Sequence, residues 1–102
     1  MSLTRVGSNL TDAADLITLT DGATINWDMS EGESAQVTLG GNRTLATPTN
    51  ADNGATYVLK VIQDGTGSRT LSFSAAFVFE DKAVPTLSSA PNSEDILVFW
   101  YD

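Results

Sequence analysis

The stretch Leu59–Phe73, LKVIQDGTGSRTLSF, decides how the rest of the chain is interpreted. Two strand-like apolar flanks enclose the polar segment Asp64–Arg69. A Walker-type phosphate loop requires a lysine after its second glycine and a helix after the lysine, and this segment offers neither. Asp-Gly is instead a strong hairpin signal, because glycine adopts a positive φ without steric cost. The stretch therefore predicts a β-hairpin, with Arg69 in a surface or cross-strand ion pair.

Apolar and polar residues alternate on both sides of this stretch, which is the pattern of half-buried strands. The segments 23–29 and 34–39 each place three apolar residues on one face: Ile25, Trp27 and Met29 in the first, Ala35, Val37 and Leu39 in the second. The segment 55–62 is apolar on both faces apart from Lys60. A strand of that kind is central in a sheet or has one face on another subunit.

Turn signals separate these segments at Glu31–Glu33, Gly40–Arg43 and Asn50–Gly54. Turns spaced roughly 8–12 residues apart are typical of sandwiches and barrels. We therefore expect an all-β fold, an antiparallel jelly-roll-like β-sandwich of about eight short strands over residues 16–102. Residues 1–15 are expected to form an extended N-terminal arm, and no internal repeat is visible.

The composition excludes several classes of function. The 102 residues suit one domain, with 13 acidic against five basic residues and a net charge of −8. Without histidine or cysteine there is no Ser-His-Asp triad, no disulfide and no thiolate metal site. The negative charge disfavours nucleic acid and anionic membranes. We expect no catalytic residues, no cofactor, no metal, and no nucleic-acid or membrane partner.

The acidic residues of DMSEGE, Asp28 to Glu33, allow two interpretations. Their alternating oxygen ligands suggest calcium, but the segment has no glycine at the position that an EF-hand loop requires, and no distal glutamate. Carboxylate pairs could also serve glycoside hydrolysis. Acids at strand ends are usually solvated, so we favour an acidic turn.

The closing stretch DILVFWY is the most hydrophobic of the chain. Its consecutive aromatic residues must point alternately to both faces of a strand, so Phe99 and Tyr101 share one face and Trp100 takes the other. Such a strand is either covered on both sides or part of a subunit contact. The predicted subunit interface comprises Lys60, Ile62, Phe99, Trp100 and Tyr101.

Four strings resemble a module found in structural proteins of tailed bacteriophages: DGATINWDM (21–29), VTLGGNRTLATPTN (37–50), GATYVLKVIQDGTGSRTLSF (54–73) and SEDILVFWYD (93–102). The resemblance covers Asp21–Asp102. It implies a small jelly-roll or sandwich domain of a tail fibre, or of a head-fibre or decoration protein, often trimeric. Tail-fibre versions continue beyond the last strand, whereas this sequence stops at Asp102.

The resemblance implies a virion structural protein, made in the host cytoplasm. The short chain favours a capsid decoration (cement) protein that stabilises the outside of the head, with the major capsid protein as partner and a homotrimer as the assembly. The arm carries apolar residues without strand periodicity, so we expect it to contact the capsid, with a frayed terminus as the alternative. The predicted contact residues are Leu3, Arg5, Val6 and Leu10. The alternative function is a receptor- or glycan-binding domain of a tail fibre. A polysaccharide-degrading enzyme is a third, disfavoured by the missing histidine and the small size.

Overall fold

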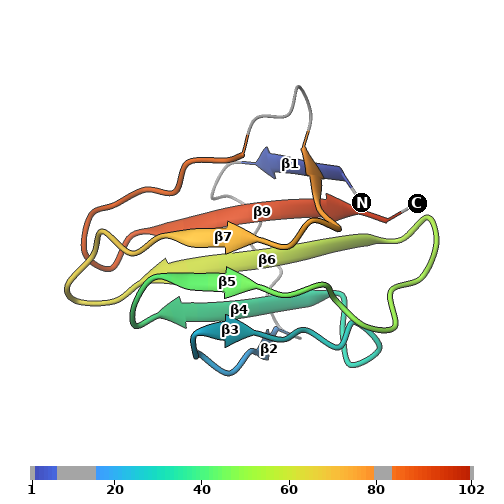
Figure 1. The fold of residues 1–102 in the computed structure, drawn as a ribbon, viewed down its shortest axis with the longest axis horizontal. Helices are drawn as coiled ribbons and strands as arrows, with labels where there is room; N and C mark the ends of the chain where they lie inside the picture. The colour runs from blue at the N-terminus through green and yellow to red at the C-terminus, as the bar shows by residue number, and fades with distance from the viewer. Residues whose placement is uncertain (1, 7–15, 80–83, 102) are drawn as a thin grey trace.

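The computed structural model describes residues 2–6, 16–79 and 84–101. This part of the chain contains strands and no helix, so no helix within it could cross a membrane (Figure 1). The strands are β1 (Ser2–Val6), β2 (Ile17–Thr18), β3 (Thr24–Ile25), β4 (Ser34–Leu39), β5 (Arg43–Leu45), β6 (Thr56–Gln63), β7 (Leu71–Phe73), β8 (Val78–Phe79) and β9 (Glu94–Trp100).

The strands form two sheets that lie one in front of the other (Figure 1). The larger sheet has six strands in the order β2-β4-β6-β9-β1-β8, and the smaller has three in the order β3-β5-β7. The smaller sheet covers the part of the larger one that contains β4 and β6 (Figure 1). An all-β fold with two sheets agrees with the expectation from the sequence.

The pairing within the sheets differs from that expectation. From β2 to β7 the chain passes alternately from one sheet to the other, and each strand pairs in parallel with the equivalent strand of the next turn. Ile17 pairs with Ala35 and Ala35 pairs with Leu59, while Thr24 pairs with Thr44 in the other sheet. The result is three stacked coils, β2-β3, β4-β5 and β6-β7. Antiparallel pairing joins β9 to β6 and to β1, so the antiparallel jelly-roll is not confirmed.

The stretch Leu59–Phe73 shows how the coil arises. Its flanks β6 and β7 lie in different sheets, so the turn between them is an arch and the hairpin prediction was wrong. The polar residues of the segment still form the turn, but the positive φ falls at Gly67 and Ser68 instead of at Gly65. Asp64 Oδ1 accepts the backbone N–H groups of Thr66 and Gly67, each at 3.0 Å. Gly67 has a φ of 76°. The same turn residues serve a hairpin or an arch, and β7 pairs with β5 instead of β6.

The core fills the space between the sheets. The predicted inward residues of the segments 23–29 and 34–39 are all buried, and the inward face of β6 is buried as well. Trp27 lies at the centre, with its ring edge-on to Tyr57 at 6.0 Å and to Phe99 at 6.1 Å between centroids. Aromatic edge contacts of this kind add to the stability gained from buried area.

The N-terminal segment forms part of the larger sheet where it is described. β1 pairs antiparallel with β9 from Ser2 opposite Trp100 to Val6 opposite Ile96, and its first residues pair in parallel with β8. Residues 7–15 of the expected arm lie outside the described part of the chain. The first third of the expected arm is therefore a strand between two others.

Candidate binding pocket between two arches

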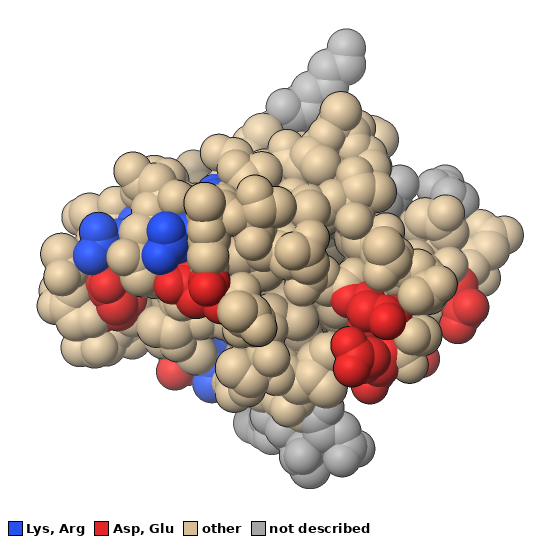
Figure 2. Space-filling view, turned by 60° about the horizontal axis from the view of Figure 1, so that its bottom comes forward, with Lys and Arg blue, Asp and Glu red and all other residues tan. Residues whose placement is uncertain are grey.

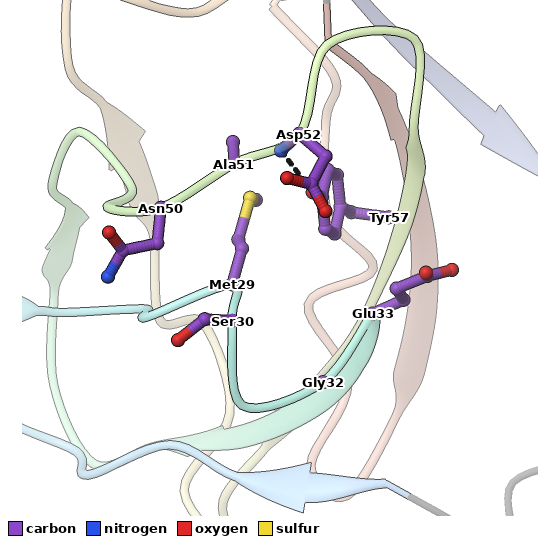
Figure 3. A pocket seen from close by; sticks show the side chains of 8 residues that line it. All are labelled: Met29, Ser30, Gly32, Glu33, Asn50, Ala51, Asp52 and Tyr57. Carbon is purple, nitrogen blue, oxygen red and sulfur yellow. Dashed lines mark hydrogen bonds between the residues drawn. The ribbon is translucent and has the colours of Figure 1, made fainter.

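A pocket of about 620 Å³ opens between the arch that joins β3 to β4 and the arch that joins β5 to β6. Its size falls within the usual range of small-molecule sites, about 300–1,000 Å³. Figure 3 shows the Met29 side chain rising between the arches toward Ala51, with Asp52 beside it. The lining residues are Met29, Ser30, Gly32, Glu33, Asn50, Ala51, Asp52 and Tyr57.

Backbone pairing holds the two arches against each other. The N–H of Met29 donates to the carbonyl of Thr49 at 2.9 Å, and the N–H of Thr49 donates to the carbonyl of Trp27 at 3.0 Å. Asp28 and Thr49 thereby form an isolated parallel bridge, which continues the coil stacking beyond the strands. The pocket is consequently built on paired backbone, which gives it a fixed shape.

The Asp28 side chain links the two arches by hydrogen bonds. Its Oδ1 accepts the Ser30 hydroxyl at 2.6 Å, the Asn50 amide at 2.9 Å and the Ser30 backbone N–H at 3.0 Å. These hydrogen bonds, that of the Ser30 hydroxyl foremost, hold the pKa of Asp28 below its ordinary value. Asp28 is therefore ionised at neutral pH and engaged in the arches.

The floor of the pocket is apolar, with one hydroxyl. Met29 is 3% exposed and Tyr57 1% exposed, so only a small part of each side chain is accessible from the pocket. The Tyr57 hydroxyl accepts the backbone N–H of Asp52 at 2.7 Å (Figure 3). Among the described residues, this hydroxyl donates to no acceptor.

The pocket is acidic. Glu33 and Asp52 line it, and no lysine or arginine does. Figure 2 shows acidic side chains gathered at the right-hand end of the molecule, where the two arches lie in Figure 1. Among the described residues, no group of three or more acidic side chains is placed to hold a metal ion.

The opposite end of the coils carries charges of both signs (Figure 2). Arg43 binds Asp21 with Nε 2.9 Å from Oδ1, and Arg69 binds Asp64 with Nη2 3.0 Å from Oδ2. The ion pair expected for Arg69 is thus confirmed, with a partner from its own arch. At this end the bases and carboxylates neutralise each other in pairs, whereas the carboxylates that line the pocket at the other end have no base beside them in the lining.

The residues predicted for the subunit interface lie in two environments. Lys60 and Ile62 are half-buried on the outer face of β6, where Lys60 Nζ lies 3.2 Å from Glu94 Oε1. Trp100 is 45% exposed, and its Nε1 donates to the Gly54 carbonyl at 3.2 Å. Phe99 lies in the core at 0% exposure and presents no surface to a partner.

The remaining predicted contacts involve the chain ends. Tyr101 is partly buried against the core, on the same side as Phe99 and opposite to Trp100. Leu3, Arg5 and Val6 belong to β1, and Leu10 lies outside the described residues. The structure brings the C-terminal aromatic residues together with β1 in one sheet, but it does not gather them at the pocket.

Comparison with known proteins identifies first the class of protein to which the chain belongs and then its family. The match is to a structural component of phage virions, in accordance with the resemblance seen in the sequence. A family model described as "Putative phage tail fibre C-terminal domain" matches residues 20–102, and the chain belongs to this family. No curated protein and no solved structure matches the chain.

Sequence reasoning missed the pocket. It treated Asp28 to Glu33 as an acidic turn and Asn50–Gly54 as a loop, without placing them together. A signal was present: the string Arg-Thr-Leu occurs at 43–45 and again at 69–71, each time after a glycine-containing turn. Such a repeat is typical of stacked coils, in which the arches of successive coils lie side by side.

Proposed function

We propose that this domain is a receptor-binding domain of a phage tail fibre and that its ligand is a glycan of the host surface. The observation that carries the proposal is the family match, which names a tail fibre domain and spans residues 20–102. The match gives no comparable support to a capsid decoration protein. We assign no reaction to the domain.

The architecture suits recognition by arches on a rigid scaffold. Parallel strands fix the coils, and the arches at the acidic end enclose a pocket. Binding residues commonly lie on loops that a rigid scaffold positions. The same logic would allow the arches to vary between relatives while the coil stack stays constant.

We propose a homotrimer as the working assembly. The outer face of the six-stranded sheet carries the half-buried apolar residues Val58, Ile62 and Val98 around Lys60, which suits a subunit contact. Trp100, 45% exposed, extends this face. Three linked copies would raise avidity for a repetitive surface far above the affinity of one site. The molar mass of the purified chain in solution, measured by light scattering over a range of concentrations, tests this assembly, and a monomer at all concentrations would contradict it.

Immunogold electron microscopy tests the location. An antibody raised against the purified chain is applied to intact virions that contain this protein. Gold at the ends of the fibres is expected, since a receptor-binding domain must reach the host first. Gold spread over the head surface would overturn the proposal and restore the capsid decoration function.

A further inference from the structure

We infer that the pocket between the β3–β4 and β5–β6 arches is the glycan-binding site, and that it takes an uncharged or amine-bearing sugar and rejects acidic sugars. The inference rests on the proposed function for the chemical class of the ligand. It adds the place of the site, its polarity and the residue that donates to the ligand.

The pocket has the dimensions and surface of a sugar site. Its volume of about 620 Å³ accommodates a short oligosaccharide rather than a single ion. Met29 and Tyr57 lie at its base and are almost fully buried, so the surface open to a sugar is mainly polar. Asp52 supplies a carboxylate beside Met29, while the side chains of Glu33 and Asn50 point outward on either side (Figure 3), with the Asn50 amide N–H bound to Asp28. Carboxylate and amide oxygens accept hydrogen bonds from sugar hydroxyls.

Tyr57 supplies a donor from the floor. Its ring is 1% exposed and is fixed edge-on against Trp27 at 6.0 Å. The hydroxyl oxygen is occupied by the N–H of Asp52 at 2.7 Å, which orients the remaining proton away from that bond. This proton has no acceptor in the described part of the chain. A ring or hydroxyl oxygen of a sugar would satisfy it.

Charge sets the selectivity. The pocket is lined by two carboxylates and by no base, in a chain of net charge −8. Of the bases whose side chains are described, Arg43 is bound by Asp21, Arg69 by Asp64 and Lys60 by Glu94. An acidic sugar would therefore lose hydration without gaining a countercharge, which is unfavourable. An ammonium group would gain a carboxylate partner.

Titrations with three oligosaccharides of equal length test the inference: tetraglucosamine, maltotetraose and tetragalacturonate. Binding is followed by NMR chemical-shift changes at constant ionic strength. We expect tetraglucosamine to bind tightest, maltotetraose more weakly and tetragalacturonate at least about tenfold more weakly than maltotetraose. Added salt should weaken the binding of tetraglucosamine and leave the binding of maltotetraose unchanged.

Variants locate the site. Tyr57→Phe should weaken maltotetraose binding about three- to tenfold, the effect of losing one hydrogen bond. Asp52→Asn should weaken the binding of tetraglucosamine more than that of maltotetraose, since it removes the negative charge and keeps a polar group. Glu94→Gln is the matched control: it removes the same charge on the outer face of β9, away from the pocket, and should leave both affinities unchanged. Asp52 is exposed, so its variant keeps the test valid if Tyr57→Phe lowers stability.

The outcomes separate this inference from the proposed function. Equal binding of the acidic oligosaccharide, or unchanged affinity in both pocket variants, overturns the assignment of the pocket. Failure of all three oligosaccharides to bind overturns it as well, and gold at the fibre ends in that case leaves the proposed function intact. Gold over the head overturns the proposed function whatever the titrations give.

Discussion

Arg43 of the second coil binds Asp21 of the first in a two-point ion pair, with Nε 2.9 Å from Oδ1 and Nη2 3.0 Å from Oδ2. Asp21 Oδ2 also accepts the N–H of Gly40 at 3.2 Å. One carboxylate thereby joins the arches of two successive coils. Two-point pairs between arginine and carboxylate combine charge with fixed geometry, so this pair sets the spacing of the coils at the end away from the pocket.

The first prediction concerns this pair. Arg43→Gln should lower the melting temperature at pH 7 by a few degrees, because it removes the link between the first two coils. Lys60→Gln is the matched control, since Lys60 loses a single contact to a half-exposed carboxylate of Glu94. The control should change the melting temperature less, and circular dichroism measures both.

The effect of Arg43→Gln should also depend on pH. The hydrogen bond from Arg43 holds the pKa of Asp21 below its ordinary value of 3.8. A carboxyl whose folded-state pKa is lowered stabilises the fold above its unfolded-state pKa, and loses that contribution as the pH falls through the folded-state pKa. The difference in melting temperature between wild type and Arg43→Gln should be constant above about pH 5 and shrink below about pH 4. A difference that grows on acidification would contradict the ion pair.

The local features of the fold could be predicted from the sequence. The inward residues of β4 follow from a period of two, which depends only on neighbouring positions. In β6, which is apolar on both faces, the period separates the two faces but does not indicate which one is inward. The arch after β6 was recognisable as a turn, because Asp64 and Gly67 supply a side-chain acceptor and a positive φ within a few residues. Burial is thus encoded locally, whereas the segment 23–29, expected to be a single strand, forms a strand only at Thr24–Ile25.

The pairing of the strands could not be predicted in the same way. β7 pairs with β5 instead of β6, a partner that the turn between β6 and β7 does not specify, because the same turn residues suit a hairpin or an arch. The pocket depends on the same choice, because parallel stacking brings Asp28 beside Thr49. A search that aligned the Arg-Thr-Leu strings would have suggested the coils. It would not have given the register, in which Arg43 lies opposite Leu71.

The second prediction concerns the arch after β6. Gly67→Ala should destabilise the protein by about 3 kcal/mol, because its φ of 76° and its surroundings both oppose a side chain. A Cβ at Gly67 would lie 2.7 Å from the Ser89 carbonyl oxygen and 2.8 Å from Pro91 N. Gly65→Ala in the same arch is the control, since nothing lies within 4 Å of its added Cβ. Urea unfolding should show little change in stability for Gly65→Ala. Equal effects of the two variants would contradict the close approach of Gly67 to Ser89 and Pro91.

The third prediction concerns a buried amide. Gln63 is 2% exposed, and its side chain accepts the N–H of Arg69 at 2.9 Å and donates to the carbonyls of Arg69 and Ser88 at 2.9 and 3.1 Å. Gln63→Leu should cost about 3 kcal/mol, because it removes the side-chain partner of both the N–H and the carbonyl of Arg69, while the Ser88 carbonyl keeps the Ser93 hydroxyl as a donor. Gln36→Leu makes the same replacement on the outer face of β4 and should change stability by less than about 0.5 kcal/mol. Chemical unfolding of both variants decides the matter, and a tolerated Gln63→Leu would show that the amide is dispensable.

The fourth prediction concerns β1. Deleting residues 2–6 should lower the melting temperature by on the order of 10 °C, because β9 loses a partner along five residues. The exposed edge of this hydrophobic strand should also promote self-association, which light scattering would detect as an increase in mass. Thr4→Pro keeps the chain length and removes one donor opposite Val98, so it should act in the same direction with a smaller effect. A truncated chain with unchanged melting temperature and mass would mean that residues 2–6 are not needed in the sheet. The segment would then regain the role of an arm that contacts a partner.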